Sequence, residues 1–162
     1  MRDVAPALSD LPRNVIDTWQ FCFTEMLNNA KDHSEGTLVH VAVVRTAADT
    51  RITLNDNGIG IFKKIQNALN LLDERHAVLE LSKGKLTTDP QGHTGQGIFF
   101  TSRLLDSFDL LSGACFFTHK SGDDQDWIVE VSEPRSGTSV IMKLNNASAR
   151  CGIRAKANGI PG

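Results

Sequence analysis

Glu25, Asn29 and Asp32 recur at intervals of four and three residues, so in a helix they lie on one stripe. The apolar residues centred on Met26 form a separate stripe, which puts the three polar side chains at the edge of a buried face. Carboxylate and amide oxygens one turn apart are ligands of the kind that Mg²⁺ prefers. The same spacing also occurs on ordinary solvated helix faces, so by itself it leaves both interpretations open.

A second group of residues, Asp56-Asn57-Gly58-Ile59-Gly60, directly follows a strand-like segment. The two glycines would let the backbone approach a flat ligand closely, and the carboxylate would accept a hydrogen bond from an amine such as that of adenine. Asn-Gly is also a common turn dipeptide. A simple β-turn therefore remains the alternative.

A third group, Gly92-His93-Thr94-Gly95-Gln96-Gly97, precedes an apolar segment that we expect to be helical. Backbone N–H groups at a glycine-rich helix start can bind phosphate. The order G-x-x-G-x-G is the reverse of the dinucleotide-binding fingerprint, and Gly84-Lys85 lacks the other residues of a P-loop. The alternative is a flexible loop that caps the following helix.

Other chemistries find little support in the sequence. The histidines (33, 40, 76, 93 and 119) show no metal-binding spacing, and no serine lies in a G-x-S-x-G motif. The three cysteines, Cys22, Cys115 and Cys151, form no C-x-x-C pair, so we expect reduced thiols.

The composition is that of a folded domain of ordinary charge. There are 17 Lys+Arg and 19 Asp+Glu residues, a formal net charge of −2, and 40% of the 162 residues are hydrophobic. This length corresponds to about one domain. The near-neutral charge argues against direct nucleic-acid binding, and no apolar run is long enough to span a membrane. Because the first ten residues also lack the apolar stretch of a signal peptide, we expect a cytoplasmic protein.

The hydrophobic periodicity predicts the elements that must position these motifs. We expect an N-terminal lead-in over 1–13, a domain over 14–144 and a poorly ordered tail over 145–162. The predicted helices cover residues 14–30 (ending near 34–36), 61–72, 74–81 and 97–105, with a loop over 82–96. The predicted strands cover 37–46, 51–55, 108–119 (as a pair turning at Ser112-Gly113), 126–131 and 138–144. This order predicts an α+β fold, with helices on one face of a mixed, mostly antiparallel sheet.

Together, the motifs resemble the GHKL ATPases, a superfamily that includes the DNA gyrase B subunit, a heat-shock chaperone, the histidine kinases and the mismatch-repair protein MutL. Glu25-x-x-x-Asn29-Ala30-x-Asp32 resembles their N box, and Asp56-x-Gly58-x-Gly60 resembles their first glycine box. Gly92-x-x-Gly95-x-Gly97 resembles the second glycine box, and Gly137-Thr138 the closing Gly-Thr element. The likeness extends over most of the predicted domain and includes some features of anti-sigma-factor kinases.

The resemblance implies the Bergerat ATP-binding fold, a two-layer α/β sandwich that holds ATP between helices and sheet. It implies Asn29 as the ligand of a phosphate-bridging Mg²⁺ and Glu25 as general base. Asp56 would accept from the adenine amine with support from Thr138. The remaining implied ATP contacts are Asp32, His33, Gly58, Gly60, Gly95, Gln96 and Gly97. Residues 61–91 would form the ATP lid, and Lys83, Lys85 or His93 would supply positive charge.

The resemblance leaves the type of activity open. A protein kinase, a slow regulatory ATPase and a non-catalytic ATP-sensing or anti-sigma-like binding module all fit it. No histidine lies in a phospho-acceptor helix before the N box, and no second domain supplies a lysine to the site. We therefore expect a protein partner or phospho-acceptor in trans, or a longer native protein, and a homodimer is compatible with either.

Overall fold

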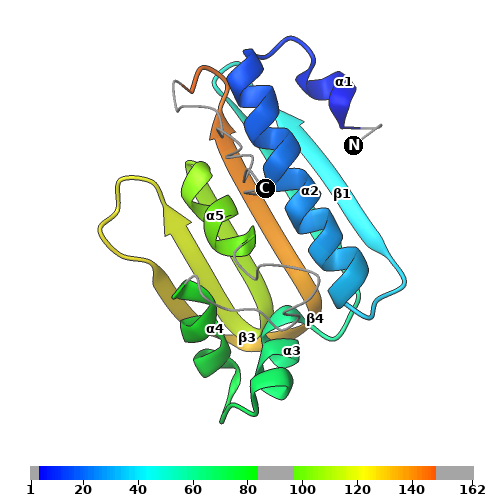
Figure 1. Cartoon of the computed structure of the whole chain (residues 1–162), viewed down its shortest axis with the longest axis vertical. Coiled ribbons are helices and arrows are strands. Elements are labelled where there is room, and N and C mark those ends of the chain that lie inside the picture. The colour runs from blue at the N-terminus through cyan, green and yellow to red at the C-terminus, as the bar shows by residue number, and fades with distance from the viewer. Residues whose placement is uncertain (1–3, 84–96, 149–162) are drawn as a thin grey trace, which may run out of the picture.

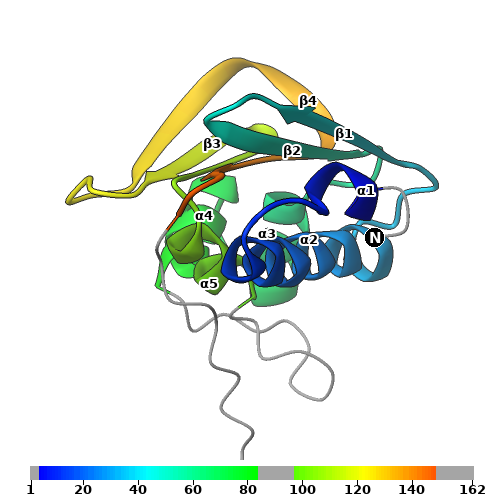
Figure 2. The ribbon, with the colours of Figure 1, turned by 90° about the horizontal axis from the view of Figure 1, so that it is seen from above.

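The computed structural model of the chain describes residues 4–83 and 97–148 and consists of two layers (Figure 1). Figure 2 shows a four-stranded sheet with the helices on one of its faces. This arrangement confirms the predicted α+β sandwich. The elements are α1 (Ala5–Leu8), α2 (Arg13–His33), β1 (Val39–Arg45), β2 (Asp49–Asp56), α3 (Ile61–Leu69), α4 (Glu74–Ser82), α5 (Gly97–Leu104), β3 (Ser107–Lys120) and β4 (Trp127–Asn145).

The strands are ordered β1-β2-β4-β3, and all three neighbouring pairs are antiparallel. The last strand therefore lies inside the sheet, where Asn55 of β2 pairs with Ser139 of β4. On β2 and β4, alternate residues such as Ile52 and Met142 are fully buried beneath the helices. This period of two is what a sheet covered on one face requires.

Helix α2 provides the largest apolar surface of the helical layer. Its predicted stripe is buried, and it includes Trp19, Cys22, Phe23, Met26 and Ala30. Burying one large apolar side chain, such as that of Phe23 or Met26, stabilises the folded state by about 1.5–3 kcal/mol. The helix runs to His33, in line with the predicted end near 34–36, and there the Ser34 N–H donates to the Ala30 carbonyl and Glu35 adopts a left-handed φ of 59°.

Helices α3 and α4 pack against β3 through Phe62, Ile65, Ala77, Val78 and Leu81, all of them buried. Residues 61–83, the part of the expected lid that the structure describes, thus contribute to the core. Helix α3 is three residues shorter than the predicted segment 61–72 because Asn70 adopts a left-handed φ of 51°.

Two strand predictions were wrong. Residues 108–119 do not form a hairpin turning at Ser112-Gly113, because β3 continues through this point with a β-bulge. Segments 126–131 and 138–144 are not separate strands, because β4 runs unbroken from Trp127 to Asn145. Gly113, with φ of 55°, absorbs the irregularity without reversing the chain.

Both flanks of the predicted domain contact the core where the structure describes them. In the lead-in, Val4, Leu8 and Leu11 are buried against the main cluster. After β4, Asn146 is buried and accepts a hydrogen bond from the Thr50 hydroxyl at 2.7 Å. Residues 149–162 of the expected tail lie outside the described residues.

Candidate functional site

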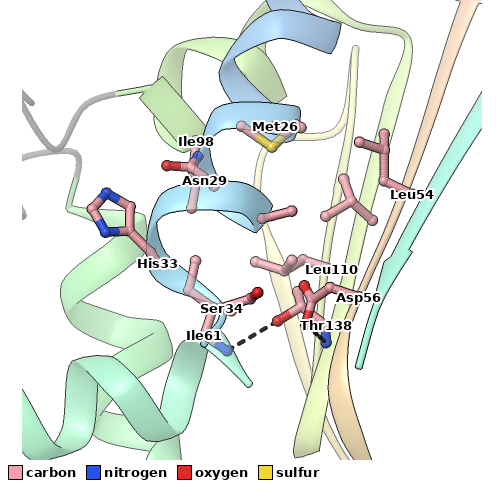
Figure 3. Close-up of a pocket in the computed structure, with 12 residues that line it drawn as sticks. Met26, Asn29, His33, Ser34, Leu54, Asp56, Ile61, Ile98, Leu110 and Thr138 are labelled. Atoms are coloured by element: carbon pink, nitrogen blue, oxygen red, sulfur yellow. Dashed lines mark hydrogen bonds between the residues drawn. The ribbon is translucent and has the colours of Figure 1, made fainter. Parts of the chain in front are cut away.

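A pocket opens between the end of α2 and the helix-covered face of the sheet (Figure 3). Its lining comprises Met26, Asn29, Ala30, His33, Ser34, Leu54, Asp56, Ile61, Ile98, Leu110, Thr138 and Val140. Seven of these side chains are apolar and five are polar, and this combination is typical of small-molecule sites.

Asp56 is the best-fixed polar group in the pocket. It ends β2, and its Oδ1 accepts hydrogen bonds from the backbone N–H of Gly58 at 2.9 Å and of Thr138 at 3.2 Å. Within the described parts of the chain, no group donates to the other carboxylate oxygen. Asp56 therefore retains one hydrogen-bond acceptor for a ligand while the first oxygen holds the carboxylate in place.

Thr138 connects the sheet to the start of α3. Its hydroxyl accepts a hydrogen bond from the Ile61 N–H at 3.0 Å, and this N–H is one of the donors that a helix leaves free in its first turn (Figure 3). The Asp56–Thr138–Ile61 contacts thus join β2, β4 and α3 around one side of the pocket.

Helix α2 supplies the opposite wall. Asn29 and His33 line the pocket one turn apart, and Figure 3 shows the His33 ring on the side away from Asp56. Asp32 is exposed and is not among the lining residues. The predicted polar stripe is therefore divided, with Asn29 in the pocket wall and Asp32 exposed outside it.

Glu25 lies against Gly97 at the first residue of α5. It is half-buried, and a Cβ added to Gly97 would overlap its Oε2. Neither residue lines the pocket, but Met26 and Ile98, their neighbours in the chain, do. The structure thus brings the first and third sequence motifs into direct contact beside the pocket, and the helix dipole of α5 favours a carboxylate at this end.

The predicted glycines Gly58 and Gly60 are both buried in the turn after β2. A Cβ on Gly58 would overlap the Ser34 carbonyl at the end of α2, and this carbonyl also accepts from the Ile59 N–H at 2.9 Å. Gly60 has a φ of 89°, which disfavours any other residue. The turn is consequently packed directly against the last turn of α2.

Lys64 adds a charged contact at the same junction. Its Nζ donates to the His33 carbonyl at 2.7 Å and lies 3.4 Å from Oε1 of Glu35. A cation at a helix C-terminus interacts favourably with the helix dipole. This contact therefore holds α3 against the end of α2.

Several expected residues cannot be placed. Gly95 and Gln96 lie outside the described residues, as do Lys85 and His93. Lys83 follows α4 and is exposed, with its ammonium paired to Glu80.

The sequence motifs missed most of the pocket wall. The pocket wall also includes residues that belong to none of these motifs: Ser34, Leu54, Leu110 and Val140. The last three lie on strands, where the alternation of apolar residues indicates only that they are buried. Gly137 belonged to the closing element, but its role is visible only in the structure. Its φ is 75°, and a Cβ there would overlap the Asp56 carbonyl.

A separate polar cluster anchors α5 from its other end. The guanidinium of Arg103 pairs with Asp126, and His119 Nδ1 lies 2.7 Å from Asp126 Oδ1. Burial alone would raise the pKa of Asp126, but the hydrogen bonds from Arg103 and His119 outweigh it and lower the pKa. Elsewhere, burial raises the pKa of the Cys22 thiol to about 12, so this cysteine is a structural thiol, not a reactive one.

Comparison with known families bears directly on this geometry. Residues 14–148 match the family model described as histidine kinase-, DNA gyrase B- and HSP90-like ATPase. The chain belongs to this ATPase family. It therefore carries an ATP-binding domain of the GHKL type, in agreement with the predicted resemblance. A search of curated proteins gave no match.

Two features are absent from the described residues. None of their helices is both long and apolar enough to cross a membrane. They also contain no cluster of three or more metal-ligating side chains of the His, Cys, Asp or Glu type.

Proposed function

We propose that this domain binds ATP together with Mg²⁺ and uses it to phosphorylate a protein or to hydrolyse ATP slowly in a regulatory role. The observation that supports the proposal is the convergence of Asn29, Asp56 and Thr138, from three separate elements, on one apolar pocket. An apolar cavity with one fixed carboxylate suits an adenine ring with its exocyclic amine.

Each predicted site residue has a role in this proposal. The free oxygen of Asp56 accepts from the adenine amine, and Thr138 supports this contact through water. Gly58 and Gly60 give the base room, and His33 lines the pocket beside the nucleotide, while Asp32, which is exposed, has a lesser role. The segment Gly95-Gln96-Gly97 contacts the phosphates, with backbone N–H groups of the glycines as donors.

The residues present fit a magnesium ion that arrives with the nucleotide. Mg²⁺ keeps several waters and takes few protein ligands when phosphates are available. The amide oxygen of Asn29 is one such ligand in the pocket wall, and no preformed cage is required. When bound, the ion would neutralise charge on the transferred phosphoryl group.

Glu25 is the proposed general base. Its carboxylate lies one turn from Asn29 on α2 and against the start of α5, so it can accept a proton from an attacking hydroxyl or water beside the phosphates. A module that only binds ATP would not need a carboxylate at this position. Glu25 therefore favours turnover over pure binding.

Two variants test these roles. Glu25→Ala should keep ATP affinity and lose turnover, whereas Asn29→Ala should lose both. Asn28→Ala is the matched control, because Asn28 is a half-buried amide on the same helix and does not line the pocket. Equal turnover in the wild type and in Glu25→Ala would eliminate the catalytic role.

ATP labelled at the γ-phosphate distinguishes the activities. Label transferred to a lysate protein indicates a kinase that acts on a partner in trans, and free phosphate indicates an ATPase. Mg²⁺-dependent binding with neither product would identify the alternative, an ATP-sensing or anti-sigma-like regulatory module. We infer a cytoplasmic setting, where ATP and such partners are available.

A further inference from the structure

The two edges of the sheet differ in how they are protected. Natural sheets block their edges with bulges and charged side chains, because an unpaired strand can bind another chain. On β3 the register shifts at Gly113, and the Glu74 carboxylate accepts from the Ala114 N–H at 3.3 Å. Strand β1 pairs with β2 in unbroken register, contains four valines among its seven residues and has no proline.

The hydrogen-bond pattern identifies which backbone groups of β1 are free. The Thr46 N–H donates to the Asp49 carbonyl at 2.8 Å, and the Leu38 carbonyl accepts from the Asn57 N–H at 3.3 Å. In an antiparallel ladder alternate residues bond to the same neighbour, so the even-numbered residues of β1 face β2. Val39, Val41, Val43 and Arg45 therefore direct their N–H and C=O groups outward, and the described residues provide no backbone partner for them.

The side chains of this edge are also incompletely covered. Val39, Val41 and Val43 pack against the core from the helix-covered face, yet each remains only half-buried. The one charged residue of the strand is Arg45, and its guanidinium is already bonded to Asp10 and to the Ala7 carbonyl. The edge therefore combines unpaired backbone, β-branched side chains and no unneutralised charge.

We propose that the free edge of β1 pairs antiparallel with β1 of a second copy of this chain. An antiparallel pair centred on Ala42 places Val41 opposite Val43 and Val39 opposite Arg45 in both copies. In this register, the outward-facing backbone groups of all four residues are paired. If the two-fold axis passed through Val41 or Val43 instead, one of the four residues would have no partner in the other strand. Such a two-fold contact is self-complementary and joins the two sheets into one.

A second copy of this chain is a suitable partner because its own β1 is complementary to the free edge. A partner strand must present β-branched residues at alternate positions on the helix-covered face, together with matching free backbone groups. Strand β1 itself has both. A pair of seven-residue strands is a small interface compared with the roughly 1,200–2,000 Å² of stable complexes, so the dimer exchanges with monomer. This inference does not depend on nucleotide binding.

A cysteine placed on the two-fold axis tests the register. In the proposed pair Ala42 lies opposite its own copy, with Cα atoms about 4.5 Å apart, which suits a disulfide. Ala42→Cys should therefore cross-link under mild oxidation and give a band at twice the monomer mass that a reductant removes. Val44→Cys is the matched control, because Val44 lies on the same face and is 58% exposed but would be opposite His40 of the other copy. Cross-linking of both variants to the same extent would overturn the proposed register.

Proline substitutions test whether the outward-facing backbone groups of β1 form the dimer. Val41→Pro removes an N–H that points outward, so analytical ultracentrifugation should show a folded monomer where the wild type self-associates with rising concentration. His40→Pro removes an N–H that faces β2 and should instead lower the melting temperature. A wild type that stays monomeric at every concentration, or an unchanged dimer in Val41→Pro, would refute the proposal.

Discussion

Asp56 and Thr138 are 82 residues apart in the chain, and a 3.2 Å hydrogen bond joins the carboxylate of the first to the backbone N–H of the second. The bond joins β2 to β4 at one side of the pocket. Because it uses Oδ1, the same oxygen that Gly58 engages, it leaves the other oxygen available to a ligand. In the proposed role of Asp56, one carboxylate oxygen supports the structure and the other binds the ligand.

Asp56→Asn should separate these two functions. The amide oxygen can still accept from Gly58 and Thr138, while the other atom becomes a donor that opposes the adenine amine. A hydrogen bond to a charged group contributes about 1.5–3 kcal/mol, so ATP affinity should fall about tenfold to a hundredfold with the melting temperature nearly unchanged. Calorimetric titration measures this. Asp56→Ala should in addition lower stability, and unchanged affinity in Asp56→Asn would remove Asp56 from the binding site.

Thr138→Val should destabilise the domain. The substitution keeps the shape of the side chain but removes the oxygen that accepts from the Ile61 N–H, leaving a partly buried donor unpaired at the start of α3. Such a loss amounts to about 1–3 kcal/mol in urea unfolding. Thr138→Ser retains the hydroxyl and should stay within about 1 kcal/mol of wild type. Equal losses in the two variants would show that the methyl group, not the hydroxyl, matters.

Gly137→Ala should be more damaging than Gly122→Ala. Both glycines have positive φ, 75° and 95°, so alanine is strained at either position, by about 1–2 kcal/mol. A Cβ added at Gly137 would overlap the backbone carbonyl of Asp56. A Cβ added at Gly122 would have no other atom within 4 Å. We expect Gly137→Ala to have the lower melting temperature and also weaker ATP binding. Matching melting temperatures would mean that the turn simply shifts.

Asp126→Asn should destabilise the protein at neutral pH and have less effect in acid. The pKa of Asp126 in the folded state lies below the ordinary value of 3.8, so its stabilising contribution is fully present above that value. It is lost as the pH falls through the folded pKa, and the stability gap between wild type and variant should then close. Urea unfolding at pH 7 and at a series of pH values well below 3.8 measures how this stability gap changes. The exposed Asp124→Asn is the control, and a gap that widens in acid would contradict the assignment.

The layered fold and the motif-bearing turns were predictable because their signals are local. The stripe from Trp19 to Ala30 repeats with the helical period, and Asp56 to Gly60 interrupts a strand with residues that favour turns. The contact between Glu25 and Gly97 depends instead on how α2 packs against α5, which neither segment encodes alone.

The errors on β3 and β4 have a common physical cause. A glycine within an apolar strand fits a turn and a bulge equally well, and the neighbouring strand decides which one forms. At Gly113 the pairing with β4 resumes on both sides, so the chain continues as one strand. Likewise, residues 132–137 contain proline and glycine but remain part of β4. The order β1-β2-β4-β3 is similarly a property of the whole chain, since β2 and β4 are neighbours in the sheet but are not consecutive in the sequence.

The interior position of β4 affects how the protein can be made. This strand is the last in the described sequence, yet it pairs with both β2 and β3, and it carries Thr138 and Val140 into the pocket. During synthesis, β2 has no neighbour on that side until β4 leaves the ribosome. A nascent chain that stops before β4 therefore has an open sheet and an incomplete pocket. Long-range pairing of this kind slows folding, so the chain should depend on chaperones mainly until its final strand is released.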